Sequence, residues 1–160
     1  MELTHKKEHA HYWKLYIDGA SRNNPGLSGA GVYILKDSKP VFARGYFLGV
    51  KTNNQAEYLA LLIGLHVVTA LMGEQDLLLI TSDSLLLVRQ LKGEYAIRNE
   101  YIRTAHIVAK QLLEDIKYDV GHVLRDNNKH ADALANKGID EKMRVPEEFL
   151  NILRAHGISL

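Results

Sequence analysis

The spacing of apolar residues changes along the chain, and this change limits the possible folds more than any other feature. Apolar and polar residues alternate from Trp13 to Ile17, and two further β-rich runs follow at residues 29–35 and 41–48. Residues 37–40 supply a turn between the last two runs. Three short strands joined by tight connections predict an antiparallel meander that begins near Tyr12.

Beyond residue 53 the apolar residues recur at helical spacing. A helix is expected to start near Asn54, and the continuously apolar run LLLITS (77–82) is typical of a buried parallel strand. Helices are expected from Ser84 to Leu91 and over 100–114, a strand over 118–124, a helix over 127–138, and a short amphipathic segment near the end. This order predicts an α/β fold with a five-stranded mixed sheet, its first three strands antiparallel, flanked by helices.

The length of 160 residues, with 46% hydrophobic content, is enough for one domain with a substantial core. We expect a flexible tail over 1–11, a catalytic domain over 12–140 and a helical extension over 141–160. The absence of cysteine excludes disulfides and thiolate chemistry, and favours a cytoplasmic location. The chain contains no run of about 18 apolar residues, so we expect no membrane partner. The net charge of +1 means that any nucleic-acid surface must be local.

Four acidic residues stand near predicted strand ends and helix starts. Asp18 precedes Gly19 at the end of the first strand, where Asp-Gly could simply form a turn. Glu57 follows Asn54 by three positions and could belong to a capping box. Asp83 could cap a helix, and Asp132 falls in the first turns of another, where a negative charge is favourable. Each acid has an ordinary explanation, but their joint placement at one end of one sheet does not.

Carboxylates held close together repel one another unless cations neutralise them. Sites with oxygen ligands only, and with room for water and phosphate, favour Mg²⁺ or Mn²⁺. Two such ions about 4 Å apart can activate a water molecule on one side of a phosphodiester and stabilise the leaving oxygen on the other. The four acids therefore predict a metal-dependent phosphodiesterase.

Four segments of the chain closely resemble the motif blocks of type 1 ribonuclease H, in the order of that family. These segments are YIDGASRNNPG (16–26), TNNQAEYLAL (52–61), ITSDS (80–84) and NKHADALAN (128–136). The resemblance implies a ribonuclease H-like fold, and an endonuclease that cuts the RNA strand of RNA–DNA hybrids to leave 5′-phosphate and 3′-hydroxyl ends. It also implies that Asp18 bridges two metal ions, that Glu57 and Asp83 hold one of them, and that Asp132 completes the other site.

An enzyme of this kind must distinguish 2′-hydroxyl groups on one strand from their absence on the other. The resemblance implies that Asn24, Asn53, Asn54 and Gln55 contact the hybrid, although all four could simply be turn or cap residues. Ser84, which directly follows Asp83, is a further candidate for substrate binding. We expect the protein to act as a monomer.

The sequence departs from the family pattern at two places. Many members carry a histidine in a loop before the last catalytic aspartate, but here that loop is short and His122 falls too early, so Arg125 and His130 are the auxiliary candidates. The lysine-rich helix that some members use as a handle for the hybrid is replaced by KGEYAIRN (92–99). The loss of phosphate contacts made by such a handle predicts weaker binding.

Two other functions remain open on sequence grounds. One is a catalytically silent module that binds a hybrid or RNA on the same scaffold. The other is a related nuclease that acts on DNA, such as a resolvase or integrase core. The silent module should lack at least one of the four acids, and the DNA nucleases lack the TNNQAEY block, so both features favour the hybrid nuclease.

Overall fold

The first three strands form an antiparallel meander in the structure, a computed structural model that describes residues 10–160. They are β1 (Tyr12–Ser21), β2 (Gly26–Lys36) and β3 (Lys39–Lys51). β2 pairs with β1 on one side and with β3 on the other, both antiparallel. All three strands are longer than the β-rich runs that predicted them, because the alternation weakens at the glycine-rich ends while backbone pairing continues.

Two further strands complete a five-stranded mixed sheet. They are β4 (Leu77–Ser82) and β5 (Lys117–His122), and the strand order is β3-β2-β1-β4-β5. β4 is parallel to both β1 and β5. The predicted fold class, with three antiparallel strands followed by parallel ones, is confirmed.

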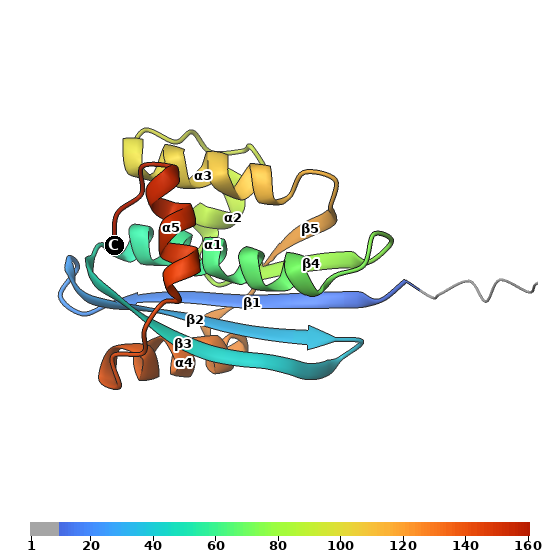
Figure 1. Cartoon of the computed structure of the whole chain (residues 1–160), viewed down its shortest axis with the longest axis horizontal. Coiled ribbons are helices and arrows are strands. Elements are labelled where there is room, and N and C mark those ends of the chain that lie inside the picture. Colours follow the sequence, from blue (N-terminus) through green and yellow to red (C-terminus); the bar gives the residue numbers. More distant parts are fainter. Residues whose placement is uncertain (1–9) are drawn as a thin grey trace, which may run out of the picture.

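Helices cover both faces of this sheet (Figure 1). The helical elements are α1 (Asn53–Leu71), α2 (Leu85–Leu91), α3 (Glu100–Leu112), the 3₁₀ turn η1 (Arg125–Asn127), α4 (Lys129–Asp140) and α5 (Glu147–Ala155). Helices α1, α2 and α3 lie on one face, and α4 lies on the other against β1, β2 and β3. Within residues 10–160, no helix combines the length and the apolar character that a membrane crossing requires.

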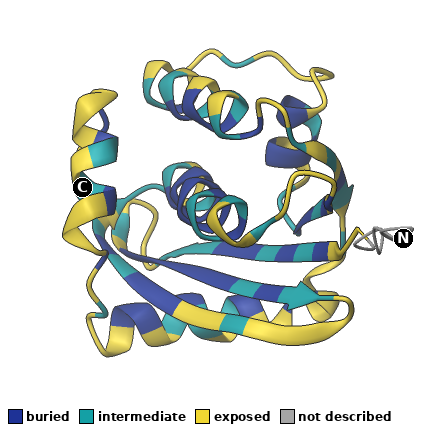
Figure 2. Cartoon of the chain, turned by 45° about the vertical axis from the view of Figure 1, so that its right-hand side comes forward, coloured by how far each residue is buried: buried dark blue, intermediate teal, exposed yellow. Residues whose placement is uncertain are grey.

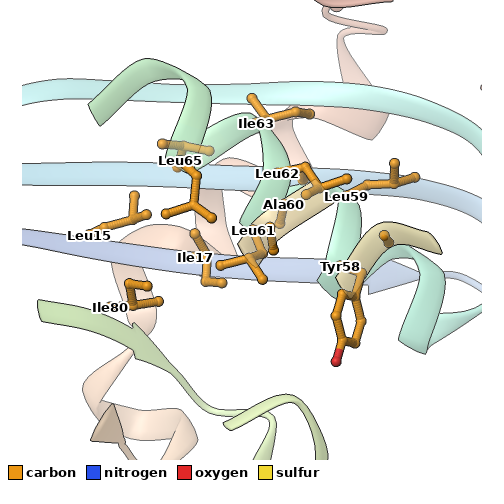
Figure 3. Close-up of a cluster of buried hydrophobic side chains, with 14 of the residues drawn as sticks. Leu15, Ile17, Tyr58, Leu59, Ala60, Leu61, Leu62, Ile63, Leu65 and Ile80 are labelled. Carbon is orange, nitrogen blue, oxygen red and sulfur yellow. The ribbon is translucent and has the colours of Figure 1, made fainter. Parts of the chain in front are cut away.

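The core lies mainly between α1 and the sheet. Leu15, Ile17 and Ile80 project from β1 and β4 toward Leu61 and Leu65 of α1 (Figure 3). Helix α1 is buried on most sides because α3 covers its outer surface, as the dark ribbon of Figure 2 shows. Burial of this apolar surface, at about 25 cal/mol per Å², is the main contribution to stability.

Two sequence expectations about element ends were wrong. Asp18 does not end the first strand, because Gly19 to Ser21 continue β1 by pairing with β2. The helix expected from residue 127 begins at Lys129, since the preceding residues form the tighter turn η1. Residues 92–99, which stand where some family members carry the lysine-rich handle, join α2 directly to α3. Their two basic residues are Lys92 and Arg98. The predicted tail over 1–11 falls almost wholly outside the described residues. His5 and His9, whose i, i+4 spacing could suit a metal ion on a helix, also lie outside them.

The C-terminal segment packs back on the domain through α5. Phe149 is 2% exposed, and its ring centroid lies 5.0 Å from that of His66 on α1. Leu153 and Ile158 join the same core cluster. The last elements of the chain are therefore part of the folded unit.

Replacing Phe149 with alanine is expected to destabilise the protein by about 3–5 kcal/mol, because a large buried ring would leave a cavity. The melting temperature should fall by about 10 °C, as measured by circular dichroism. Asn151→Ala, on the exposed side of α5, is the control and should change it little. An unchanged melting temperature for Phe149→Ala would show that α5 does not stabilise the fold.

Candidate active site

Two of the predicted acids lie side by side where β1 and β4 separate. The parallel pairing of these strands ends at Ile17 and Ser82, and Asp18 and Asp83 are the residues that directly follow these two. Asp18 remains held by β2 opposite Gly31 and is 5% exposed, whereas Asp83 leads into the loop before α2. The strand geometry itself therefore brings the two carboxylates together.

Glu57 reaches the same place because α1 packs unusually close to β1. A Cβ atom on Gly19 would lie 2.3 Å from backbone atoms of Ala56 and Glu57, so only glycine permits this contact. The backbone N–H of Gly19 donates to Oε2 of Glu57 at 3.1 Å. The glycine after Asp18 thus serves a close helix–strand contact rather than the turn that an Asp-Gly pair often forms.

Asp132 approaches from the opposite face of the sheet on α4. A Cβ atom on Gly31 would lie 1.9 Å from the carbonyl oxygen of Ala131, which shows how closely α4 sits against β2. The side chain of Asn128 donates through Nδ2 to the carbonyl of Ile17 at 2.9 Å, directly before Asp18. The carbonyl of Asn128 then accepts the backbone N–H of Asp132 at 3.1 Å. These contacts fix the position of Asp132 relative to β1.

Helix caps do not account for Glu57 or Asp83. The capping box of α1 is formed by Thr52 and Gln55, whose backbone and side-chain groups bond reciprocally, and Glu57 takes no part in it. The N-cap of α2 is Ser84, whose Oγ accepts the N–H of Leu87, so Asp83 is free of that role. Of the ordinary explanations, only the position of Asp132 in the first turn of α4 remains.

The carboxylates form one cluster at the floor of an open cleft. Single oxygen atoms of Asp18, Glu57 and Asp83 all lie within 4.8 Å of one another. Asp132 lines the same cleft, whose volume is about 540 Å³. The other residues that line it come from the end of β1 and the turn after it, the start of α1, the N-cap of α2, η1 and α4: Gly19, Ala20, Ser21, Arg22, Asn53, Asn54, Ser84, Arg125 and Asn136.

Burial and the repulsion of neighbouring charges make Asp18 and Glu57 weak acids. Burial, followed by the charges of Asp83 and Asp132, raises the pKa of Asp18 to about 8, and the charge of Arg125 partly opposes this rise. Burial, followed by the charges of Asp18 and Asp83, also raises the pKa of Glu57 well above its ordinary value, although the N–H of Gly19 opposes it. Without a cation, a pKa of about 8 leaves Asp18 mostly protonated at neutral pH.

The cluster suits a hard divalent cation. Its donors are all carboxylate oxygens, the ligand type that Mg²⁺ and Mn²⁺ prefer, and the cleft leaves room for water and phosphate. A cation would remove the repulsion that raises the pKa of Asp18 and Glu57. The residues present therefore fit a divalent metal ion.

The residues expected to contact substrate fall into two groups. Asn53, Asn54 and Ser84 line the cleft. Asn24 and Gln55 do not, because their side-chain oxygens are engaged locally: Oδ1 of Asn24 accepts the N–H of Asn53 at 2.9 Å, and Oε1 of Gln55 accepts the N–H of Thr52 at 3.0 Å. Contact of any of the five with a hybrid stays a prediction.

The two auxiliary candidates are also separated. Arg125 in η1 lines the cleft, whereas His130 stacks on Tyr33, with ring centroids 4.5 Å apart, and lines a different cavity. His122, which precedes the loop where many family members carry their histidine, lies at the end of β5. Its Nε2 donates to the carbonyl of Asp83 at 3.2 Å. The short loop after β5 thus brings Arg125, rather than His130, to the acids.

Two polar residues that sequence reasoning missed also line the cleft. Nη1 of Arg22 pairs with Asp140 at 2.7 Å, and its Nη2 donates to Asn136 at 3.3 Å. Nδ2 of Asn136 donates to the carbonyl of Asp132, one helical turn before it. Asn136 stands in the motif block 128–136, and its i, i+4 spacing from Asp132 was the available signal.

The sheet order, with four acids converging where β1 and β4 separate, defines the ribonuclease H-like class of fold. A family model described as reverse transcriptase-like matches residues 16–138. The ribonuclease HI of Halobacterium salinarum is 39% identical over 79% of this chain, and the chain spans 63% of the length of that relative. The chain therefore belongs to the type 1 ribonuclease H family.

Solved structures agree with this membership. The crystal structure of RNase H1 from the halophilic archaeon Halobacterium salinarum matches with a TM-score of 0.77 and 34% identity, covering 81% of this chain and 98% of the other. LC11-RNase H1, solved in complex with an RNA/DNA hybrid, matches with a TM-score of 0.76 and 28% identity over the same shares of the two chains.

Proposed function

We propose that this protein is an endoribonuclease that hydrolyses the RNA strand of RNA–DNA hybrids and leaves 5′-phosphate and 3′-hydroxyl ends. The observation that carries the proposal is the cluster of Asp18, Glu57 and Asp83, with oxygens within 4.8 Å of one another, beside Asp132 in one open cleft. Membership in the ribonuclease H family, and the hybrid bound by LC11-RNase H1, support the choice of substrate.

Mg²⁺ or Mn²⁺ is the proposed cofactor, with two ions per site. Asp18, Glu57 and Asp83 would hold one ion, and Asp18 with Asp132 would hold the other. Bound there, the ions supply a nucleophilic water and charge stabilisation for the leaving oxygen. Every acid comes from a single chain, which supports action as a monomer.

The side chains of this chain position the substrate around the acids. Asn53, Asn54 and Ser84 offer short polar groups at the rim of the cleft, suited to 2′-hydroxyl groups. Arg125 places a positive charge in the same cleft, where a phosphate would pass. The negative charge that remains on the metal-free acids repels a polyanion, so substrate binding and metal loading should be coupled.

The proposal is tested by offering matched RNA–DNA hybrid, double-stranded RNA, double-stranded DNA and single strands in Mg²⁺ or Mn²⁺. Cleavage of the RNA strand of the hybrid, with products carrying 5′-phosphate ends, is the expected result. Cleavage of duplex DNA would favour the related DNA nuclease instead. Tight binding of the hybrid without cleavage in either metal would favour the silent binding module.

Arg125→Ala is expected to lower kcat for the hybrid about tenfold or more, since it removes a positive charge beside the reacting phosphate. Arg125→Lys keeps the charge and should retain most of the rate. Arg103→Ala, on the exposed surface of α3, is the control and should match the wild type. Steady-state cleavage at saturating Mg²⁺ measures all three, and a normal kcat for Arg125→Ala would exclude the auxiliary role.

A further inference from the structure

A second cavity, of about 220 Å³, lies near the acidic cleft, on the face of the sheet that α4 covers. Its floor includes Tyr16, two residues before Asp18 on β1, so that both side chains project to the same side. Its lining also includes Asn128, four residues before Asp132. We call it the tyrosine cavity, and it is lined by Tyr16, Tyr33, Leu35, Asn127, Asn128 and His130.

Aromatic rings form the walls of the tyrosine cavity. Tyr33 and His130 stack with centroids 4.5 Å apart and planes inclined by 13°. Tyr16 is paired with Tyr33 across the strands, with centroids 6.1 Å apart and planes inclined by 50°. Since His130 is exposed, the ring face turned away from Tyr33 is open to another planar group.

Asn128 supplies an unused polar atom at this cavity. The residue is 2% exposed, and its Nδ2 donates to the carbonyl of Ile17. A carbonyl can only accept, so this bond fixes the orientation of the amide. Its Oδ1 is buried and has no hydrogen-bond partner within residues 10–160. A buried acceptor left without a partner is unfavourable, so Asn128 is held here at a cost that its bond to Ile17 partly offsets.

We propose that the tyrosine cavity binds one unpaired nucleobase from a single-stranded extension of the hybrid, an inference that rests on the proposed function. A base offers a flat face that can stack on the exposed ring of His130. The volume of about 220 Å³ suits a single flat ring system and is too small for a duplex. No lysine or arginine lines the cavity, which favours a base over a phosphate.

The test compares hybrids that carry a four-nucleotide single-stranded extension, made either of adenines or of abasic residues, at each of the four strand ends in turn. Binding is measured by fluorescence anisotropy in Ca²⁺, another cation that prefers oxygen ligands. At one of the four strand ends, the hybrid with the adenine extension should bind about fivefold tighter than the hybrid with the abasic extension. This ratio corresponds to the lower end of the free energy of base–aromatic stacking. The abasic arm keeps the phosphates, so the difference reports the base alone.

His130→Ala and Tyr33→Leu should each reduce this adenine preference to less than about twofold, because each substitution removes an aromatic ring from the stack. The affinity for a blunt hybrid should stay unchanged in both variants, which also shows that they are folded. His156→Ala, an exposed histidine at the end of α5, is the matched control and should keep the full preference.

Equal binding of adenine and abasic extensions at all four ends would overturn the proposal, as would a preference that survives both substitutions. Cleavage of the blunt hybrid in Mg²⁺ is followed in the same preparations. A protein that cleaves blunt hybrid but ignores the adenines overturns the cavity proposal alone. A protein that neither binds nor cleaves any hybrid overturns both this inference and the proposed function.

Discussion

Replacing Asp18 or Asp83 with asparagine is expected to reduce hybrid cleavage in saturating Mg²⁺ by about a thousandfold or more. Each substitution removes one negative oxygen from a cluster whose ligand atoms lie within 4.8 Å, and a neutral amide oxygen holds a divalent cation poorly. Metal ions contribute several kcal/mol to such reactions, and each 1.4 kcal/mol corresponds to about a factor of ten in rate. Single-turnover cleavage with excess enzyme measures the loss.

The matched control is Asp115→Asn, at an exposed position after α3 whose positive φ asparagine also tolerates. This variant should cleave hybrid at the wild-type rate. Melting temperatures establish that all three variants are folded. Full activity in either Asp18→Asn or Asp83→Asn would show that the cluster is not the catalytic centre, and the proposed function would then lose its main support.

The stability of the metal-free protein should fall as the pH rises from about 4 to about 8. In the folded protein, burial and the neighbouring acids raise the pKa of Asp18 to about 8, whereas an aspartate in the unfolded chain has a pKa of about 3.9. Between these values the folded state binds more protons than the unfolded state, so each rise in pH favours unfolding. The raised pKa of Glu57 acts in the same direction.

Asp18→Asn should therefore melt higher than the wild type in chelator at pH 8, by about 5 °C or more, and show a smaller slope with pH. Saturating Mg²⁺ should reverse the order, because the ion binds the folded wild type and stabilises it by about 2.7 kcal/mol at one hundred times its Kd. Thermal melts from pH 4 to 9, with and without Mg²⁺, measure both effects. A wild-type melting temperature in chelator that stays constant over this range would contradict the crowded cluster.

The sequence predicted the fold well, because the spacing of apolar residues and the order of elements carry that information. The change from alternation to helical spacing near Asn54 located the meander and α1, and the apolar run before Asp83 identified the parallel strand β4. Boundaries were less accurate. The pairing of Gly19 to Ser21 with β2 depends on a neighbouring strand, which local pattern does not report.

The acids of the candidate site were predictable as a set, whereas the surrounding side chains were not. Whether Thr52 or Asn54 caps α1 depends on backbone angles at the loop, and the choice releases Glu57 from a capping role. The stacking of His130 on Tyr33 joins residues almost one hundred positions apart. Such contacts depend on where α4 begins relative to the sheet, which the turn η1 sets.

The close seating of α4 also bears on how such a site can change during evolution. Asp132 reaches the cleft because Gly31 leaves no side chain between β2 and the carbonyl of Ala131. The distance between Asp132 and the acids on the other side of the cleft therefore depends on the absence of a side chain at Gly31. Substitutions at the rim of the cleft leave this packing unchanged, whereas a methyl group added at Gly31 would displace α4 and with it the carboxylate of Asp132. Selection for new specificities therefore has freedom at the edge of this cleft and almost none beneath it.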